Sequence, residues 1–258
     1  MLTALILTKN EEKNLERCIE SLKFCDEIVL IDDESDDSTT KIAKKLGVKL
    51  LINKMVDYGS QRNWAIDQIK SGWVLFVDAD EVVSKELGDS IQEIVTKNEA
   101  NGYLINRVDY IWSHKFRFGD VGNVWLLRLA KRGAGKWERT IHETWTIDGR
   151  VGKLKGELSH YPHQSVVEFL KHLNRYSTLK AKEFYKDGKK TNIFEITLGP
   201  IWIFFKLYIL KLGIFDGTAG FVHAGLMSFY MFMVAGKLYL RYNGIHGNRQ
   251  TQSNQALA

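Results

Sequence analysis

The fold class of this chain is most evident in WVLFVDADE, residues 73–81, where an apolar run leads directly into three carboxylates. Residues 73–77 have the length and the aromatic and β-branched composition of a buried strand. Asp78, Asp80 and Glu81 follow at once. Like charges this close repel one another and resist desolvation. The stretch therefore predicts that a cation or a cluster of hydrogen-bond donors lies against these carboxylates.

The first ninety residues alternate between short apolar runs and helical patterns. Strands separated by helices pair in parallel through right-handed crossovers, which indicates an α/β sheet. Polar clusters follow three of the strands: TKNEE after the first, DDESDD after the second and DADE after the fourth. Ligands of such sheets bind at the carboxyl ends of the strands, so we expect the clusters to share one ligand. The predicted strands are residues 2–8, 27–31, 48–52 and 73–77, with a short helix at 61–69 before the last.

The second half of the chain has a different pattern. From about residue 101 we expect longer strands, and residues 165–186 form a basic, amphipathic helical pattern. Residues 217–236 carry no charge besides that of His223, and such a segment is long enough to span a bilayer. Tyr and Trp beside Lys and Arg in residues 193–241 favour a membrane-surface or partly inserted helical hairpin. The alternatives, in order, are a soluble helical subdomain or dimer interface, and a true span.

Charge and cysteine content narrow the class of protein. Residues 1–90 hold 12 basic and 18 acidic side chains, a net of −6, and the remainder holds 24 and 13, a net of +11. The basic half is suited to an anionic membrane or a phosphorylated acceptor. Its basic residues are scattered without a recognisable motif, so no nucleic acid is expected as a partner. Two cysteines outside any CxxC pair, with no secretory signal, indicate a cytosolic protein with reduced thiols.

The spacing of Asp78 and Asp80 gives the motif its chemistry. Alternate residues of a strand project to the same side, so both carboxylates point one way. Hard oxygen donors suit Mg²⁺ or Mn²⁺, which keep positions open for phosphate oxygens. The alternative is that one Asp caps the following helix and the other is solvated.

Four segments in order, ALILTKNEEKNLERCIESL, EIVLIDDESDDST, GSQRNWAI and WVLFVDADE, resemble the family 2 inverting glycosyltransferases with the GT-A fold. The later IHETW and FFKLYILKLGIFDGTAGFVHAG resemble the branch that holds lipopolysaccharide-core β-glucosyltransferases. The resemblance implies a Rossmann-like, mostly parallel sheet flanked by helices, followed by a helical, membrane-associating extension. The implied divisions are a GT-A domain at 1–160, with a nucleotide half 1–100 and an acceptor half 101–160, and a helical region 161–245. The polar composition of the last residues predicts a disordered tail at 246–258.

The resemblance also implies roles for single residues. Asp80 would bind the divalent metal, Mn²⁺ or Mg²⁺. Arg62 would lie on the nucleotide side of its short helix, with a salt bridge to Asp67 as the alternative. The full set implied to bind the nucleotide sugar is Thr8, Asn10, Glu11, Asp32, Asp33, Arg62, Asp78 and Ala79.

An inverting transferase needs a general base on the acceptor side, by the reasoning that applies to inverting glycosidases. The resemblance indicates Glu143 in IHETW, and the equally weighted alternative is a Glu paired with Arg139 or Arg150. The fallback bases are Asp120, Glu138 and Asp148. His142 and Arg128 are weighed as diphosphate or acceptor contacts against plain packing roles, and at least two of Trp125, Trp137 and Trp145 are expected in the core.

Together these features predict an enzyme that moves a hexose, by preference from UDP-glucose, to a glycolipid or lipopolysaccharide-core acceptor. The step would be a metal-dependent single displacement with inversion, carried out by a peripheral protein on the inner face of the cell membrane. The alternatives are a catalytically inactive nucleotide-sugar-binding membrane adaptor, and a transferase with a polyprenyl-phosphate or peptide acceptor.

Overall fold

The computed structural model describes residues 1–70, 72–138, 144–162 and 164–244. Two compact units make up the chain. The sheet unit comprises Met1–Tyr110 and Val121–Pro162, and the helical unit comprises Ile111–Asp120 and His163–Ala258. The predicted boundary near residue 160 differs from this division in one segment, because residues 111–120 group with the helices.

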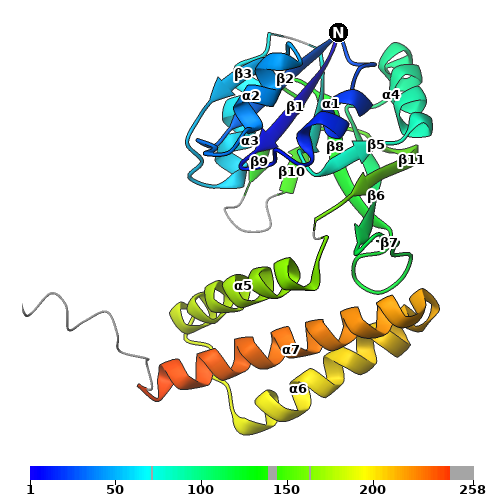
Figure 1. The fold of residues 1–258 in the computed structure, drawn as a ribbon. Helices are drawn as coiled ribbons and strands as arrows, with labels where there is room; N and C mark the ends of the chain where they lie inside the picture. The colour runs from blue at the N-terminus through cyan, green and yellow to red at the C-terminus, as the bar shows by residue number, and fades with distance from the viewer. Residues whose placement is uncertain (71, 139–143, 163, 245–258) are drawn as a thin grey trace, which may run out of the picture. The chain divides into compact units, whose positions relative to one another are not determined.

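The amino-terminal part of the sheet is parallel, as the alternating pattern predicts (Figure 1). Strand β1 (Leu2–Thr8) pairs with β2 (Glu27–Asp32) on one side and with β4 (Trp73–Asp78) on the other. Strand β3 (Lys49–Ile52) extends the sheet beyond β2. The connecting helices are α1 (Leu15–Ser21), α2 (Thr39–Lys45) and α3 (Tyr58–Asp67).

The rest of the sheet is mixed, and its order is β3-β2-β1-β4-β8-β6-β11-β5. Strand β8 pairs antiparallel with both β4 and β6, while β11 pairs parallel with β6 and antiparallel with β5. A separate antiparallel hairpin joins β9 to β10. The elements are β5 (Glu81–Val83), α4 (Lys85–Lys97), β6 (Gly102–Ile111), β8 (Val124–Lys131), β9 (Gly135–Glu138), β10 (Thr144–Ile147) and β11 (Val151–His160).

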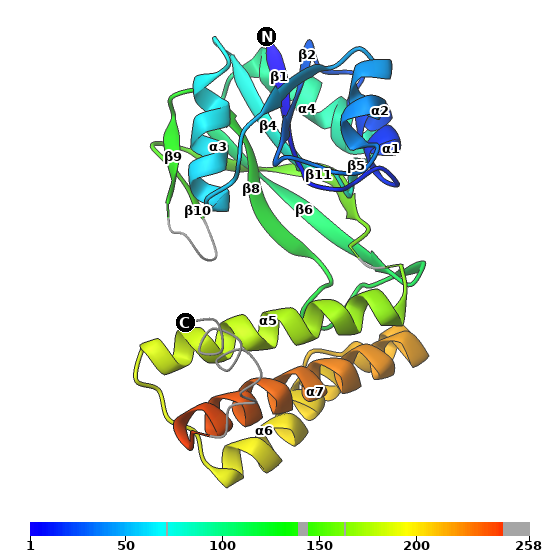
Figure 2. The same cartoon turned by 60° about the vertical axis from the view of Figure 1, so that its left-hand side comes forward.

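Helices lie on both faces of the sheet (Figure 2). Apolar clusters fill the space between them and the sheet on each face, which is why the central strands are apolar throughout. Helices α1, α2 and α4 bury Leu15, Ala43 and Leu87 against one face. Helix α3 and the β9–β10 hairpin bury Ala65, Trp137 and Trp145 against the other. Burial on both faces leaves the strand ends as the place where polar side chains can gather.

The helical unit contains α5 (Val166–Lys186), α6 (Ile193–Phe205) and α7 (Gly217–Tyr242), with the short strand β7 (His114–Lys115) (Figure 1). A π-helical turn at Lys206–Leu210 and a 3-10 turn at Gly213–Asp216 connect α6 to α7. Two stretches, Ile193–Leu210 and Gly213–Tyr242, are long and apolar enough to cross a membrane by length and composition.

The tip of the α6–α7 hairpin is built by a close backbone approach. A Cβ on Gly220 would lie 2.0 Å from the carbonyl oxygen of Gly213, so only glycine fits there. Beside it the buried carboxylate of Asp216 accepts hydrogen bonds from the backbone N–H groups of Arg117 (3.1 Å) and Phe118 (3.0 Å). The segment at residues 111–120 is thereby fixed to the hairpin tip.

Candidate active site

The register of the parallel strands brings the predicted donor-site residues together. Thr8 lies opposite Asp32 on β2, and its neighbour Leu7 lies opposite Asp78 on β4. Thr8, Asp32 and Asp78 therefore all lie at the carboxyl edge of the sheet. The buried Thr8 Oγ1 has no hydrogen-bond partner among the residues that the structure describes. A buried hydroxyl without a partner is costly, so a ligand atom at this position would be favourable.

The two aspartates after β2 have different surroundings. Asp32 is fully buried, and its carboxylate accepts hydrogen bonds from the backbone N–H (2.8 Å) and the hydroxyl (2.5 Å) of Ser35. Asp33 accepts from Lys9 Nζ and from the backbone N–H of Met55, each at 2.8 Å. Burial opposes ionisation of Asp33, but these hydrogen bonds outweigh it and lower the pKa of its carboxyl. Both groups hold the loop after β2 in place.

Asn10 and Glu11 tie the loop after β1 to the loop after β2. The Asn10 backbone N–H donates to Ser35 Oγ, and its side-chain oxygen accepts from the backbone N–H of Asp36, both at 2.9 Å. The Glu11 N–H donates to Thr39 Oγ1 at 2.8 Å. Burial raises the pKa of the Glu11 carboxyl. Hydrogen bonds to the loop after β2 thus fix the position of the loop that is predicted to bind the base.

Asp78 is held by two arginines. Arg62 Nη2 lies 3.1 Å from Asp78 Oδ1, and Arg128 Nη2 lies 2.7 Å from Asp78 Oδ2. Both arginines are buried. Burial of Asp78 opposes its charge, but Arg128 and Arg62 outweigh that effect and hold the pKa of this carboxyl well below its usual range. Arg62 therefore pairs with Asp78, and the sequence had predicted both residues at the same site.

Glu81, the third carboxylate of the stretch, is fully buried. It accepts a hydrogen bond from the backbone N–H of Asp78 at 2.8 Å, and Arg128 Nη2 lies 3.5 Å from it. Burial raises the pKa of Glu81, and Arg128 opposes that rise. Arg128, which the sequence left between a diphosphate contact and a packing role, is here a counter-ion to two carboxylates.

Asp80 has a different partner, His160, the last residue of β11. Asp80 Oδ2 lies 3.3 Å from His160 Nε2, and the other ring nitrogen, Nδ1, lies 3.0 Å from Asp109 Oδ1. Burial opposes a charge on the imidazole, but the bonds to Asp109 and Asp80 outweigh it and raise the pKa of His160 to about 10. Neither His160 nor Asp109 was expected at the site from the sequence. The only local signal for His160 was its position at the end of a strand.

A divalent cation fits this arrangement as a partly protein-bound ion. Asp80 would supply a carboxylate, and the facing His160 would supply Nε2 after losing the proton that its two carboxylate partners favour. Asp109 fixes the ring orientation, as outer carboxylates do for metal-bound histidines. Within the described part of the chain, no cluster of three or more His, Cys, Asp or Glu side chains is arranged to hold a metal. The remaining ligands would therefore have to come from water and from a diphosphate, as is usual for Mg²⁺ sites.

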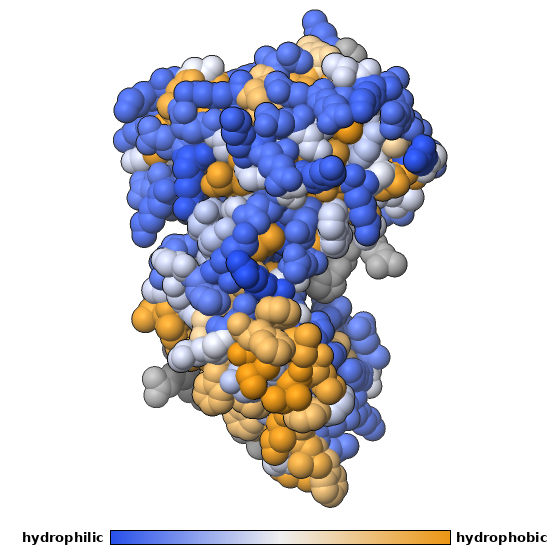
Figure 3. Space-filling model, turned by 90° about the vertical axis from the view of Figure 1, so that its right-hand side faces the viewer, coloured by the Kyte–Doolittle hydropathy of each residue, from blue (hydrophilic) through white to orange (hydrophobic). Residues whose placement is uncertain are grey.

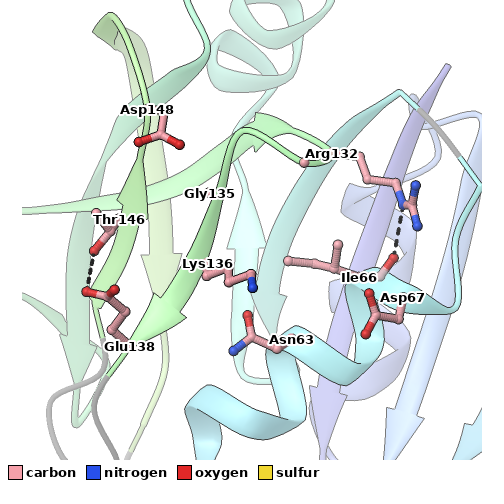
Figure 4. Close-up of a pocket in the computed structure, with 10 residues that line it drawn as sticks. Asn63, Ile66, Asp67, Arg132, Gly135, Lys136, Glu138, Thr146 and Asp148 are labelled. Carbon is pink, nitrogen blue, oxygen red and sulfur yellow. Dashed lines mark hydrogen bonds between the residues drawn. The ribbon is translucent and has the colours of Figure 1, made fainter.

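Several predicted acceptor-side residues do not join this cluster. Glu143 and His142 lie outside the described residues. Asp120 is in the helical unit, where its Oδ1 lies 3.7 Å from His223 Nδ1. Glu138 and Asp148 line a separate cavity of about 630 Å³ between α3 and the β9–β10 hairpin (Figure 4). None of the predicted donor-site residues lines that cavity; its lining is Asn63, Ile66, Asp67, Arg132, Gly133, Gly135, Lys136, Glu138, Thr146 and Asp148.

The tryptophans follow the expectation of core packing. Trp137 and Trp145 are buried, stack on each other with ring centroids 5.3 Å apart, and meet Phe76 edge-on. The Arg62 guanidinium lies 4.5 Å from the Trp137 ring centroid. Trp125 is exposed. Packing of the hairpin thus supports the arginine that holds Asp78.

The fold and the site together define a class of enzyme. An α/β sheet gathers acidic loops at its carboxyl edge, together with a buried hydroxyl that has no partner in the described part of the chain, beside a carboxylate–histidine pair suited to a divalent cation. Open α/β sheets bind nucleotide ligands at such an edge, and a divalent cation there would stabilise charge on a phosphate, so the class is a nucleotide-dependent, metal-assisted enzyme.

The family match agrees with this class. The family described as glycosyl transferase family 2 matches residues 3–146, more than half of the chain. The chain belongs to glycosyl transferase family 2.

Individual relatives extend the similarity over almost the whole chain. An uncharacterized glycosyltransferase of Rickettsia conorii is 32% identical, with 92% of this chain and 89% of the relative covered. The lipopolysaccharide core biosynthesis glycosyltransferase LpsC of Rhizobium meliloti is 30% identical, with 93% of each chain covered. The solved structure of S. aureus TarS 1–349 in complex with UDP-GlcNAc has a TM-score of 0.48 and 15% identity, over 94% of this chain and 92% of that chain.

Proposed function

We propose that the protein transfers a hexosyl group from a uridine diphosphate sugar, by preference UDP-glucose, to a saccharide acceptor of the lipopolysaccharide-core or glycolipid type. The observation that carries the proposal is the unequal treatment of the three carboxylates after β4. Arginines neutralise Asp78 and approach Glu81, whereas Asp80 faces His160. Asp80 and His160 would provide two ligands for a cation, and the diphosphate of the donor would complete its coordination.

The donor would lie along the carboxyl edge of the sheet. Thr8 Oγ1 offers a buried, unpartnered hydroxyl at the end of β1, among the residues that the structure describes, and the neighbouring Asp32 closes the same edge. The braced loops of Asn10 and Asp33 would frame the base and ribose. Glu11 and Ala79 complete the set that we assign to nucleotide-sugar binding.

Asp80 and His160 would hold Mn²⁺ or Mg²⁺, and the bound ion would supply charge stabilisation to the departing diphosphate. Asp109 would keep the His160 ring in place through its 3.0 Å contact with Nδ1. Arg62 and Arg128 hold Asp78 at the strand end and fix the position from which Asp80 projects.

Sugar transfer with inversion would take place in one displacement. A hydroxyl oxygen of the acceptor forms a bond to the anomeric carbon while the bond from that carbon to the phosphate oxygen breaks. The hydroxyl proton passes to a carboxylate base, for which we propose Glu143, and the electron pair of the broken bond leaves with uridine diphosphate. The acceptor assignment is supported by the 30% identity to a protein named for lipopolysaccharide core biosynthesis.

A cytoplasmic, peripheral position on the inner face of the cell membrane is the proposed location. Residues 111–120 and 164–244 of the helical unit carry thirteen Lys and Arg against six Asp and Glu, a net of +7. A basic surface of this kind is attracted to anionic lipids and to phosphorylated core sugars.

The test is a panel of nucleotide sugars incubated with the purified protein and Mn²⁺, Mg²⁺ or EDTA, first alone and then with lipopolysaccharide-core oligosaccharides. We expect release of uridine diphosphate from one donor, dependent on metal and accelerated by acceptor. Asp80→Asn should abolish release while the far-UV circular dichroism spectrum is unchanged. Glu143→Gln should keep donor binding but lose transfer.

The outcomes separate the alternatives. Donor binding with no turnover in the presence of every acceptor tested would support a catalytically inactive adaptor. Metal-independent release at the wild-type rate in Asp80→Asn would contradict the metal assignment. Transfer to a polyprenyl phosphate or a peptide in place of the core oligosaccharide would keep the enzyme and change its acceptor.

A further inference from the structure

Helix α6 is strongly apolar and yet unburied. None of its residues, all of which the structure describes, is buried, although the helix packs against α7. Its large exposed side chains recur every three or four residues and so form one stripe. Phe215, in the turn that leads from α6 to α7, is 69% exposed, and we count it with the stripe. We call this stripe the lipid face; its members are Phe194, Leu198, Ile201, Trp202, Phe205 and Phe215.

The lipid face is a contiguous apolar patch, whereas an ordinary protein surface exposes its apolar residues singly. Figure 3 shows apolar side chains gathered over one side of the helical unit. Monomeric soluble proteins rarely expose a contiguous patch of this kind unless another surface covers it. Length and composition alone would also allow α6 and α7 to span a bilayer.

The packing of α5 on α7 argues against a span. The two helices are in contact near both ends of α5. The ring centroids of Phe169 and His223 lie 5.9 Å apart, and those of Tyr185 and Tyr242 lie 4.8 Å apart. Between them Lys237 Nζ donates to Asn174 Oδ1 at 2.8 Å. The other side of α5 is exposed and charged, with Lys171, Arg175, Lys182 and Lys186. A spanning α7 would carry these charges into hydrocarbon, which is strongly unfavourable.

The hairpin tip leads to the same conclusion. Asp216 at the tip binds the backbone of Arg117 and Phe118, in the segment that connects β6 to β8. Moving the tip across a bilayer would break these bonds or take this segment and its charges along. Lys and Arg also flank both ends of the hairpin, with Lys206 and Lys211 near the tip and Lys189, Lys190 and Arg241 at the other end. Such a chain has no charge bias that would orient a span.

We propose that the α6–α7 hairpin lies in the plane of the membrane, with the lipid face inserted among the acyl chains of one leaflet and with α5 facing water. The exposed lysines at both ends of the hairpin reach the headgroup level, where anionic phospholipids attract them. The occupant of the lipid face is therefore a bilayer surface rich in anionic lipid. This inference deepens the membrane part of the proposed function and concerns a unit of the chain separate from the donor site.

The first experiment measures flotation of the full chain with vesicles of phosphatidylcholine alone, or of phosphatidylcholine with a quarter phosphatidylglycerol, with no donor or acceptor present. We expect binding to the anionic vesicles, weakened by salt, and at least tenfold loss of binding in Ile201→Glu. The matched control is Leu179→Glu on α5, which adds the same charge at a site 50% exposed and outside the lipid face. It should bind like wild type.

These outcomes are independent of catalysis. Equal losses in Ile201→Glu and Leu179→Glu, or no flotation of the wild type, would overturn the lipid face. Because the donor is soluble, hydrolysis of the donor sugar by Ile201→Glu should match that of the wild type. A failure of hydrolysis in all proteins would count against the proposed function and leave the membrane result standing.

The second experiment distinguishes an in-plane hairpin from a span. Ile214→Cys places a thiol at the tip, where the side chain is 46% exposed. The native thiols react slowly, because burial raises the pKa of Cys18 and raises that of Cys25 to about 12. In spheroplasts of cells that express the variant, a membrane-impermeant maleimide should label Ile214→Cys only after detergent lysis. Labelling of intact spheroplasts would show that the tip crosses the membrane and would overturn the proposal.

Discussion

Asp80 Oδ2 lies 3.3 Å from His160 Nε2, although the two residues are far apart in the sequence. The register of the sheet makes this contact. His160 pairs with Glu81 of β5 on one side and with Asp109 of β6 on the other. Because β11 lies between β5 and β6, its last side chain reaches Asp80, just before β5, and Asp109 on β6.

The first prediction concerns metal binding. Because Asp80 and His160 are the two protein donors assigned to the ion, most of its ligands must come from water or from the donor diphosphate. We expect the affinity for Mn²⁺ to rise at least tenfold when uridine diphosphate is present. Electron paramagnetic resonance of free Mn²⁺ measures this directly. Equal affinities with and without the nucleotide would contradict the two-donor arrangement, and Asp80→Asn should abolish the increase.

The second prediction concerns Asp109 as a positioning residue. Its carboxylate fixes the orientation of the His160 ring without facing the ion itself, and loss of such outer partners typically costs about 10–100-fold in metal affinity. Asp109→Asn should therefore weaken Mn²⁺ binding in the presence of uridine diphosphate by about that factor. Asp148→Asn, a change of the same type at an exposed position, should leave it unchanged. An unaltered affinity in Asp109→Asn would remove the role.

The third prediction concerns the buried arginine. Arg128 is 5% exposed and is a counter-ion to Asp78 and to the fully buried Glu81. Removal of one partner from a buried charged network typically costs about 3–5 kcal/mol, because the remaining charges lose their compensation. Arg128→Met should lower the free energy of unfolding of the sheet unit by about that amount, as measured by urea denaturation. The control is Arg132→Met, where the arginine is exposed and the expected change is below about 0.5 kcal/mol.

The fourth prediction compares two glycines of α7. A Cβ on Gly220 would lie 2.0 Å from the Gly213 carbonyl oxygen, so Gly220→Ala forces backbone apart and should destabilise the helical unit by about 1–3 kcal/mol. A Cβ on Gly225 would meet nothing within 4 Å. Gly225→Ala should instead stabilise α7 by about 0.5–1 kcal/mol, since alanine loses less backbone entropy in a helix. Thermal unfolding followed by circular dichroism measures both, and shifts of the same sign would disprove the close approach.

Much of the sheet unit follows from local pattern. The apolar runs at residues 2–8, 27–31, 48–52 and 73–77 correspond to β1 to β4 within one residue at each end. Parallel pairing through helices then places the ends of β1, β2 and β4 at one edge, so the location of Thr8, Asp32 and Asp78 at that edge is predictable from strand pattern alone. Helix α3 is less well predicted, because it begins at Tyr58 after an Asp57 cap that the pattern did not indicate.

Periodicity and composition within short windows are enough to establish the α/β class, the carboxyl edge where the acidic loops meet and the apolar character of the last helices. The groups that neutralise those acids become apparent only in the folded chain. Arg128 reaches Asp78 from β8, and His160 reaches Asp80 from β11. Such contacts depend on the register between strands that are far apart in the sequence. A local pattern does not determine this register, and a shift of one residue would turn each side chain to the opposite face.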